Sequence, residues 1–298
     1  MLVIRFRAAD EYILRHFHPH VSRSDMPKMS FLRVYHKTRK VSTIDPKARV
    51  YSLLSADGSS FREPTRDDIL RNQIVVTTLI TSLVITQLKL RGHFTHIFID
   101  EAAQVNECHA VIPLCLANDK TCIVLAGDHI QMADPIYSDE AKDQNFHLSL
   151  VERLMSVYDS TLSDPSSTPK VLLKANYRNH PEIIKFVAQV FYGGEESLKA
   201  KSVQADIPEF PPLAFYAANG REVQDSNSTS YYNEAEIMEV VEQVNRVLER
   251  WPKEWGEKQA DQILVTTPYT DQVCFRFILC RPTIIIYMFL VTCCWKFI

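Results

Sequence analysis

Two polar clusters in this sequence each follow a short apolar run directly. Asp100-Glu101 ends the run FTHIFID, and Gly127-Asp128-His129-Ile130-Gln131 ends the run TCIVLAG. In a pair of carboxylates, one can hold Mg²⁺ through water while the other orients or deprotonates an attacking water, and a nearby glutamine can position that water or a terminal phosphate. The clusters therefore indicate nucleotide hydrolysis. The alternatives are a solvated helix start at the first cluster and an ordinary Gly-Asp turn at the second.

A third cluster, Asn176-Tyr177-Arg178-Asn179-His180-Pro181, lies further along the chain. An arginine from a second domain can neutralise charge that develops on a transferred phosphoryl group, and Arg178 is the candidate for this role. Tyr177 can stack on a base or ribose. A helix-capping turn before Pro181 is the alternative, but it does not account for the Tyr-Arg pair.

The elements that must position these clusters follow from the hydrophobic pattern. Four continuous apolar runs are typical of strands covered on both faces of a parallel sheet; they are residues 74–78, 94–100, 121–128 and 171–176. Residues 102–116 have helical spacing and are long enough for a crossover helix, so the rhythm predicts an α/β fold. Ligands of parallel α/β sheets bind at the carboxyl ends of the strands, where we expect Asp100, Glu101 and Gln131 to converge.

The same rhythm continues after residue 176. We predict helices over residues 181–192 and 233–250 and strands over residues 213–216 and 262–266. Residues 160–170 are rich in Ser, Pro and Thr and form the expected linker. The predicted organisation is a first domain over residues 1–160, a partial second domain over 171–277 and a divergent apolar tail over 278–298.

Composition narrows the class of protein. The 298 residues are 46% hydrophobic and 23% charged, which is typical of one or two globular domains. The net charge of −3 gives no general attraction for nucleic acid, so such binding must depend on local patches. Seven cysteines without a CxxC pair favour a reducing cytoplasmic compartment, with the nucleus as a further possibility. The uncharged run at residues 283–295 is shorter than the roughly 20 residues of a spanning helix, which favours a buried strand over a membrane anchor.

Taken in order, the three clusters resemble motifs II, III and IV of superfamily 1 helicases of the type that includes the nonsense-mediated-decay helicase. The segments FTHIFIDEAAQVNEC, IVLAGDHIQM, SLVERL, NYRNHPEII and VTTPYTDQV are most similar to the helicase-with-zinc-finger proteins. The resemblance covers residues 8–277. It implies two RecA-like domains of the P-loop NTPase fold with ATP between them, the first incomplete and the second partial. It also implies a single strand of nucleic acid, RNA in preference to DNA, across their top.

The resemblance also implies roles for individual residues. Asp100 becomes the Mg²⁺ contact, Glu101 the catalytic carboxylate and Gln131 the sensor of the γ-phosphate, and Asp128 joins the nucleotide-binding residues. Tyr177 and Arg178 become nucleotide contacts from the second domain, with Arg178 directed across the cleft. The residues implied to contact the nucleic-acid strand are Thr77, Thr78, Thr81, Thr267 and Tyr269.

The sequence also departs from this family in one respect that affects catalysis. It contains no GxxxxGK[ST] motif, whose backbone N–H groups and lysine cradle the phosphates of the nucleotide. The match also stops after Phe277. Two functions therefore stay open for this chain, a part of an ATP-dependent helicase and a catalytically inactive module that binds nucleic acid or a protein partner; a membrane-tethered form is a third alternative.

Overall fold

The computed structural model describes residues 1–5, 30–131, 136–161, 169–202, 207–258 and 262–272. The chain divides into two compact units, residues 1–170 and residues 171–298. The predicted apolar tail over residues 278–298 and most of the predicted linker lie outside the described residues.

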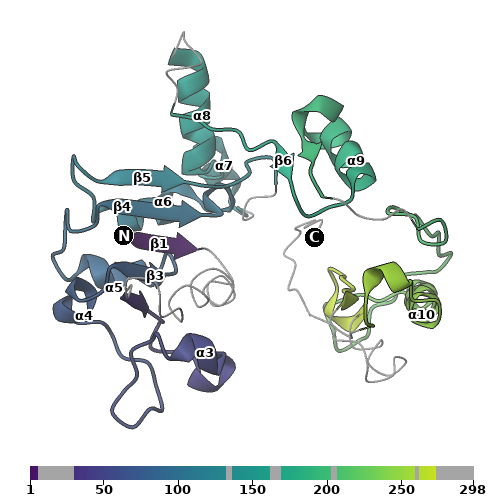
Figure 1. Ribbon diagram of the computed structural model, residues 1–298, viewed down its shortest axis with the longest axis horizontal. Helices are drawn as coiled ribbons and strands as arrows, with labels where there is room; N and C mark the ends of the chain where they lie inside the picture. The colour runs from purple at the N-terminus through teal and green to yellow at the C-terminus, as the bar shows by residue number, and fades with distance from the viewer. Residues whose placement is uncertain (6–29, 132–135, 162–168, 203–206, 259–261, 273–298) are drawn as a thin grey trace. The chain divides into compact units, whose positions relative to one another are not determined.

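Unit 1 is built on a five-stranded sheet with the strand order β2-β3-β1-β4-β5. Every pairing in this sheet is parallel, and Figure 1 shows β1, β4 and β5 running the same way. Its strands are β1 Leu2–Arg5, β2 Phe31–Arg33, β3 Ile74–Thr77, β4 His96–Asp100 and β5 Cys122–Leu125. The predicted α/β fold with a parallel sheet is confirmed, and it is consistent with a RecA-like P-loop domain.

The central strands β1 and β3 are covered on both faces of the sheet. On β1, Leu2 and Ile4 are 0% exposed and belong to the main core, whereas Val3 points to the opposite face and packs with Phe31 and Val76. Helices and 3-10 turns surround the sheet: η2 Val41–Thr43, α3 Pro46–Arg49, α4 Arg66–Leu70, α5 Ser82–Thr86, η3 Ala102–Gln104, α6 Glu107–Leu114, α7 Asp139–Asp143 and α8 Leu150–Thr161. Burial on both faces explains the continuous apolar run of β3, in which all four residues are buried. The same expectation is wrong for β5, whose residues are exposed or half-buried because it forms an edge of the sheet.

The structure adds two strands that the sequence analysis does not predict. β1 is the central strand of the sheet and pairs with both β3 and β4, and β2 forms an edge. Each is only three or four residues long, so neither gives a clear hydrophobic period. The single helix predicted over residues 102–116 is also wrong. It divides into η3 and α6, because Val105 and its neighbour Asn106 have extended backbones between them.

Unit 2 contains the two helices that the sequence predicts there. They are α9 Pro181–Phe191 and α10 Glu234–Glu249, and Figure 1 shows both. The side chain of Asn233 caps α10 by accepting from the backbone N–H groups of Ala235 and Glu236. The remaining elements are β6 Ala175–Asn176, β7 Lys199–Ala200, η5 Glu195–Ser197 and η6 Lys253–Trp255, with β6 and β7 paired in parallel.

The strands predicted in unit 2 are mostly wrong. Of residues 171–176 only the last two form a strand, and Val171 and Leu173 are 82% and 87% exposed. Residues 213–216 and the segment 262–266 also form no strand in the structure. The apolar pattern of these segments is right for strands, but a strand needs a hydrogen-bonded neighbour, and none pairs with them among the described residues.

The described part of the chain holds no helix long and apolar enough to cross a membrane. Its three cysteines, Cys108, Cys115 and Cys122, are free thiols and exposed.

The central position of β1 predicts a strong dependence of stability on Ile4. Ile4→Ala removes a side chain that is 0% exposed and should lower the free energy of unfolding by about 2–5 kcal/mol. Ile123→Ala makes the same chemical change on edge strand β5, where the side chain is 42% exposed, and should cost about 1 kcal/mol or less. Urea unfolding followed by circular dichroism measures both. Equal losses would contradict a central β1.

A second prediction concerns the capping box that starts α4. Thr65 and Asp68 cap each other's backbone N–H groups, and Arg62 hydrogen-bonds Asp68 at 2.6 Å and holds the pKa of that carboxyl well below its usual range. Asp68→Asn should cost about 1 kcal/mol at pH 7. Because the folded-state pKa is depressed, this contribution is present above about pH 4 and is lost as the pH falls further. The difference in urea midpoint between wild type and Asp68→Asn should therefore shrink in acid.

The matched control for this prediction is Asp67→Asn. Asp67 is the neighbouring exposed acid in the first turn of α4, and no capping bond depends on it. We expect this variant to stay within about 0.5 kcal/mol of wild type at both pH values. A difference for Asp68→Asn that is independent of pH would show that its charge is not the stabilising feature.

Candidate functional site

The turn after β4 holds the first pair of predicted site residues. Asp100 ends the strand, and Glu101 has a left-handed backbone with φ 58° and ψ 32°. The backbone N–H of Glu101 donates to Asp100 Oδ1 at 3.1 Å, and the side chain of Gln104 donates to Glu101 Oε2 at 2.9 Å. A left-handed conformation costs roughly 1–2 kcal/mol in a residue with a side chain and is concentrated at functional sites. The turn therefore holds two adjacent carboxylates in a fixed arrangement at the carboxyl edge of the sheet.

The turn after β5 lies directly against the turn after β4. The backbone N–H of Ala102 donates to the carbonyl of Ala126 at 2.8 Å, which joins the two turns beyond the ends of their strands. Gly127 follows, and a Cβ atom added there would lie 2.6 Å from the backbone nitrogen of Ala103. Only a residue without a side chain allows this approach. The structure therefore brings the Asp100-Glu101 pair and the Gly127-to-Gln131 turn together at one edge.

Asp128 organises the second turn. Its carboxylate accepts from the backbone N–H of Ile130 at 3.1 Å and from Nε2 of Gln131 at 3.0 Å. The Gln131 backbone N–H also donates to the Asp128 carbonyl at 3.3 Å. The Gln131 side chain is exposed, and Asp128 is half-buried. Asp128 thus holds the side-chain amide of Gln131 in place. The sequence analysis predicts that Asp128 binds the nucleotide, and these hydrogen bonds give it a positioning role as well.

Helix α8 packs against the turn that follows β4. It contacts η3, and Val151 packs into the main core. Arg153 of α8 makes two hydrogen bonds of 2.6 Å to the carboxylate of Glu107 on α6, which lowers the pKa of Glu107 and raises that of Arg153. Bidentate Arg–carboxylate pairs fix orientation as well as distance. The segment SLVERL therefore stabilises the site and contains none of the residues predicted to act on the nucleotide.

The threonines predicted to touch a nucleic-acid strand follow β3. Thr77 is 0% exposed, and its hydroxyl donates to the carbonyl of Val34 at 3.4 Å. Thr81 is 5% exposed and accepts a 2.8 Å hydrogen bond from the Thr78 hydroxyl. A buried hydroxyl does not reach an external phosphate. Thr78 is half-buried, so it is the only one of these three threonines that reaches the surface.

In unit 2 the predicted nucleotide contacts lie on the turn that leads into α9. The side chain of Asn176 accepts from the backbone N–H groups of Arg178 at 3.0 Å and Asn179 at 2.8 Å. His180 then caps α9 by accepting from the N–H of Glu182 at 3.2 Å. Tyr177 is 76% exposed, and Arg178 is exposed as well. The turn therefore caps α9, as the alternative interpretation predicts. It also exposes the side chains of Tyr177 and Arg178.

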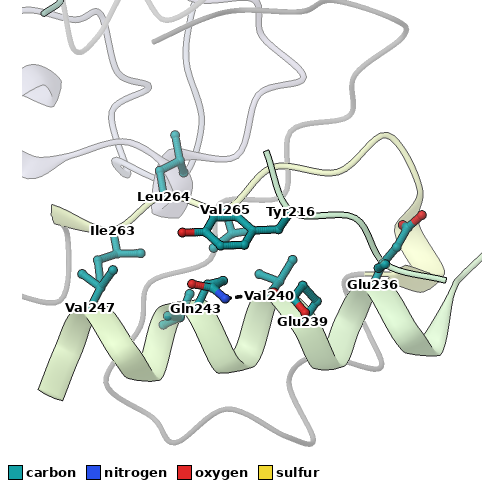
Figure 2. A pocket seen from close by; sticks show the side chains of 11 residues that line it. Tyr216, Glu236, Glu239, Val240, Gln243, Val247, Ile263, Leu264 and Val265 are labelled. Atoms are coloured by element: carbon teal, nitrogen blue, oxygen red, sulfur yellow. Dashed lines mark hydrogen bonds between the residues drawn. The ribbon is translucent and has the colours of Figure 1, made fainter. Parts of the chain in front are cut away.

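Unit 2 also carries the other two predicted strand contacts, together with a cavity. Thr267 Oγ1 accepts from the backbone N–H of Tyr269 at 3.3 Å, and the Tyr269 ring meets Tyr231 edge-on at 5.7 Å. The cavity, of about 500 Å³, lies between α10 and the segment 263–265 (Figure 2). Its lining is mainly apolar and includes none of the predicted site residues. It borders two of the segments predicted as strands, so we attribute it to their incomplete packing on α10.

Two residues that matter for the geometry have no predicted role in the sequence. Gln104 orients Glu101, and Gly127 permits the contact between the turns. The available signal for Gln104 was its position three residues after the predicted catalytic carboxylate, Glu101. The described residues contain no group of three or more His, Cys, Asp or Glu side chains arranged to hold a metal ion by themselves.

Comparison with known proteins places this site in a family. Residues 54–138 and residues 146–275 each match a family described as "AAA domain". The chain is 44% identical over 268 residues to the "Probable helicase with zinc finger domain" of Homo sapiens, a match of 89% of this chain and 13% of that protein. It is 37% identical over 261 residues to the "3'-5' exoribonuclease HELZ2" of Mus musculus (86% and 9%), and 32% identical over 221 residues to the "RNA helicase Mov10l1" of Homo sapiens (68% and 18%). The chain thus spans less than a fifth of each of these three relatives.

The close approach of Gly127 generates a prediction for the contact between the turns. Gly127→Ala places a methyl group where the Ala103 backbone lies, so the Ala102–Ala126 hydrogen bond should break or lengthen. We expect deuterium exchange in a peptide covering residues 98–106 to rise at least tenfold. Gly58→Ala is the control: the positive φ of 70° strains its own turn, but nothing lies within 4 Å of the added Cβ, so exchange over residues 98–106 should stay at the wild-type rate. Unchanged exchange in Gly127→Ala would show that the turns are not coupled.

Proposed function

The chain belongs to the superfamily 1 helicases, and on this premise we propose that it contributes the hydrolysis and strand-contacting residues of an enzyme that couples ATP hydrolysis to movement along a single strand. The observation that carries the proposal is the direct contact between the Asp100-Glu101 turn and the turn from Gly127 to Gln131. Hydrolysis needs a metal-binding carboxylate, a second carboxylate and a group that positions water within one small region. These two turns supply all three.

The polar side chains Asp100, Glu101, Gln104, Asp128 and Gln131 each have a part in this proposal. Asp100 would hold Mg²⁺. Glu101, oriented by Gln104, accepts the proton of the attacking water, and Gln131, held by Asp128, positions that water at the γ-phosphate. In unit 2, Arg178 stabilises charge on the transferred phosphoryl group, and Tyr177 stacks on the nucleotide.

The residues at this edge fit a nucleotide with Mg²⁺. The AAA domain family implies nucleotide binding, and Mg²⁺ is usually held by one or two carboxylates together with phosphate oxygens and water. Asp100 offers such a carboxylate at the carboxyl edge of the sheet, where ligands of α/β sheets bind. When bound, Mg²⁺ neutralises charge on the phosphates and orients them.

The strand order supports a division of labour along the same edge. The residues proposed for hydrolysis follow the neighbouring strands β4 and β5, and the threonine segment follows β3, which neighbours β2. β1 lies between the β2-β3 pair and the β4-β5 pair. The strand contact that we propose for unit 1 is through Thr78, and that for unit 2 is through Thr267 and Tyr269. We propose RNA as the strand, because one relative is named an RNA helicase and another an exoribonuclease. A cytoplasmic site of action is proposed with it.

The second candidate function is binding of nucleic acid without hydrolysis. It is favoured by a single observation, that the 298 residues contain no GxxxxGK[ST] motif. Without that loop the phosphates lack the cradle of backbone N–H groups and the lysine that hold them. The two candidates differ in ATPase activity and agree on binding to a single strand.

ATPase assays with and without single-stranded RNA test this proposal. The 298-residue chain should hydrolyse no ATP above background, and a longer form that carries a phosphate-binding loop should hydrolyse ATP. In the longer form, Glu101→Gln should lower kcat at least a hundredfold and leave ATP binding nearly unchanged, because the carboxylate acts mainly in the transition state. Glu249→Gln, which removes an exposed carboxylate at the end of α10, is the matched control and should retain activity.

Arg178 gives a second prediction in the same longer form. Arg178→Ala should lower kcat by roughly 10³ to 10⁵ with only a modest loss of ATP affinity. Arg221→Ala removes another exposed arginine of unit 2 and should have no such effect. In the 298-residue chain Arg178→Ala should change nothing. If the 298-residue chain hydrolyses ATP and Arg178→Ala abolishes that activity, the chain is catalytically complete. If the longer form keeps its full rate without Arg178, the proposed role of Arg178 is disproved.

A further inference from the structure

The segment that follows β2 concentrates positive charge in a chain whose net charge is −3. Between residues 33 and 49 there are six lysines and arginines and one acid, Asp45. The densest part is the loop His36-Lys37-Thr38-Arg39-Lys40, in which every residue is exposed. We name residues 36–40 the basic loop. Lys37 of the loop meets Glu63 at 3.1 Å in a pair whose side chains are 63% and 53% exposed, so this ion pair is weak and easily displaced.

The basic loop leaves the sheet next to the threonine turn. β2 and β3 are parallel with Arg33 opposite Val76, and the N–H of Val34 donates to the carbonyl of Val76 at 2.9 Å. The hydroxyl of Thr77 reaches back to the carbonyl of Val34. Because parallel strands end at the same edge, the residues after Val34 and the residues after Thr77 enter neighbouring turns. The basic loop and Thr78 therefore follow neighbouring strands at the same, carboxyl edge of the sheet.

The loop is anchored at its base. Tyr35 is 4% exposed and stacks on Phe61 with the ring centroids 4.4 Å apart. The guanidinium groups of Arg33 and Arg39 lie 4.3 and 5.7 Å from the centre of the Tyr35 ring. A turn hydrogen bond from the N–H of Arg39 to the carbonyl of His36, 3.0 Å long, closes the loop above this base. Little conformational freedom is then lost when the loop binds an anion.

We propose that the basic loop binds the phosphate backbone of a single nucleic-acid strand and continues the path of that strand from Thr78 across β2. This inference rests on the proposed function, since it assumes that a strand passes Thr78. The contact is with phosphates and does not read bases, because lysine acts as a point charge and the Tyr35 ring is covered by its neighbours. The loop therefore adds affinity without sequence preference.

The double variant Lys37→Gln/Lys40→Gln tests the proposal in the 298-residue chain. Binding of a fluorescent single-stranded oligouridine is measured by anisotropy over a range of salt concentrations. Losing two phosphate contacts should lower the slope of log affinity against log salt by about 1.4 and weaken binding at 0.1 M salt on the order of tenfold. Arg39 is left in place because it packs over Tyr35. An oligonucleotide of different sequence should show the same loss.

The matched control is Arg71→Gln/Lys120→Gln, which removes the same charge from exposed residues just before β3 and β5, at the opposite edge of the sheet. This control should keep the wild-type slope. If wild type binds and both double variants bind equally well, the basic loop is not a strand contact and the proposal is overturned. If wild type itself binds no oligouridine, the proposed strand-binding function fails and this inference fails with it.

Photocross-linking gives a readout that does not depend on the stability of the variants. Oligonucleotides containing 4-thiouridine should cross-link to wild-type peptides that include residues 36–40, and the yield there should fall in Lys37→Gln/Lys40→Gln. Cross-links confined to other peptides of unit 1 would contradict the assigned path.

Discussion

The parallel pairing of β4 with β5 is the constraint on which the site depends. It places the ends of two strands side by side, and the Ala102–Ala126 hydrogen bond extends the pairing into the turns that follow. Gly127 then lets one backbone touch the other where any side chain would separate them. With the turns in contact, Asp100, Glu101 and Gln131 share one edge although about thirty residues separate them in the sequence.

The same edge connects this region with the surface proposed for the strand. Read across the sheet, the edge carries the basic loop after β2, Thr78 after β3, the carboxylates after β4 and Gln131 after β5. β1 lies in the middle and is buried on both faces. In the proposed function, the paired strands of this one sheet join the nucleotide residues to the strand-contacting residues. This arrangement gives a physical basis for coupling hydrolysis to movement in the proposed function.

The sequence predicted the parts of this arrangement that follow from local pattern. The apolar runs before Asp100 and Gly127 indicated parallel strands, although β5 is not buried, and the rule for parallel sheets placed the polar clusters at one edge. The left-handed backbone of Glu101 and the close approach at Gly127 depend on contacts between turns, which no local pattern records. β1 was missed because four residues show no period, and residues 171–173 were misjudged because a strand also requires a partner.

The account is tested most directly by determining the structure of a longer form, with its phosphate-binding loop, bound to Mg²⁺ and a non-hydrolysable ATP analogue. The account predicts that Asp100 contacts the Mg²⁺ ion directly or through one water. It also predicts that Gln131 lies beside the γ-phosphate, with Glu101 next to the water in line for attack. A nucleotide whose metal and γ-phosphate lie away from the turns after β4 and β5 would contradict it.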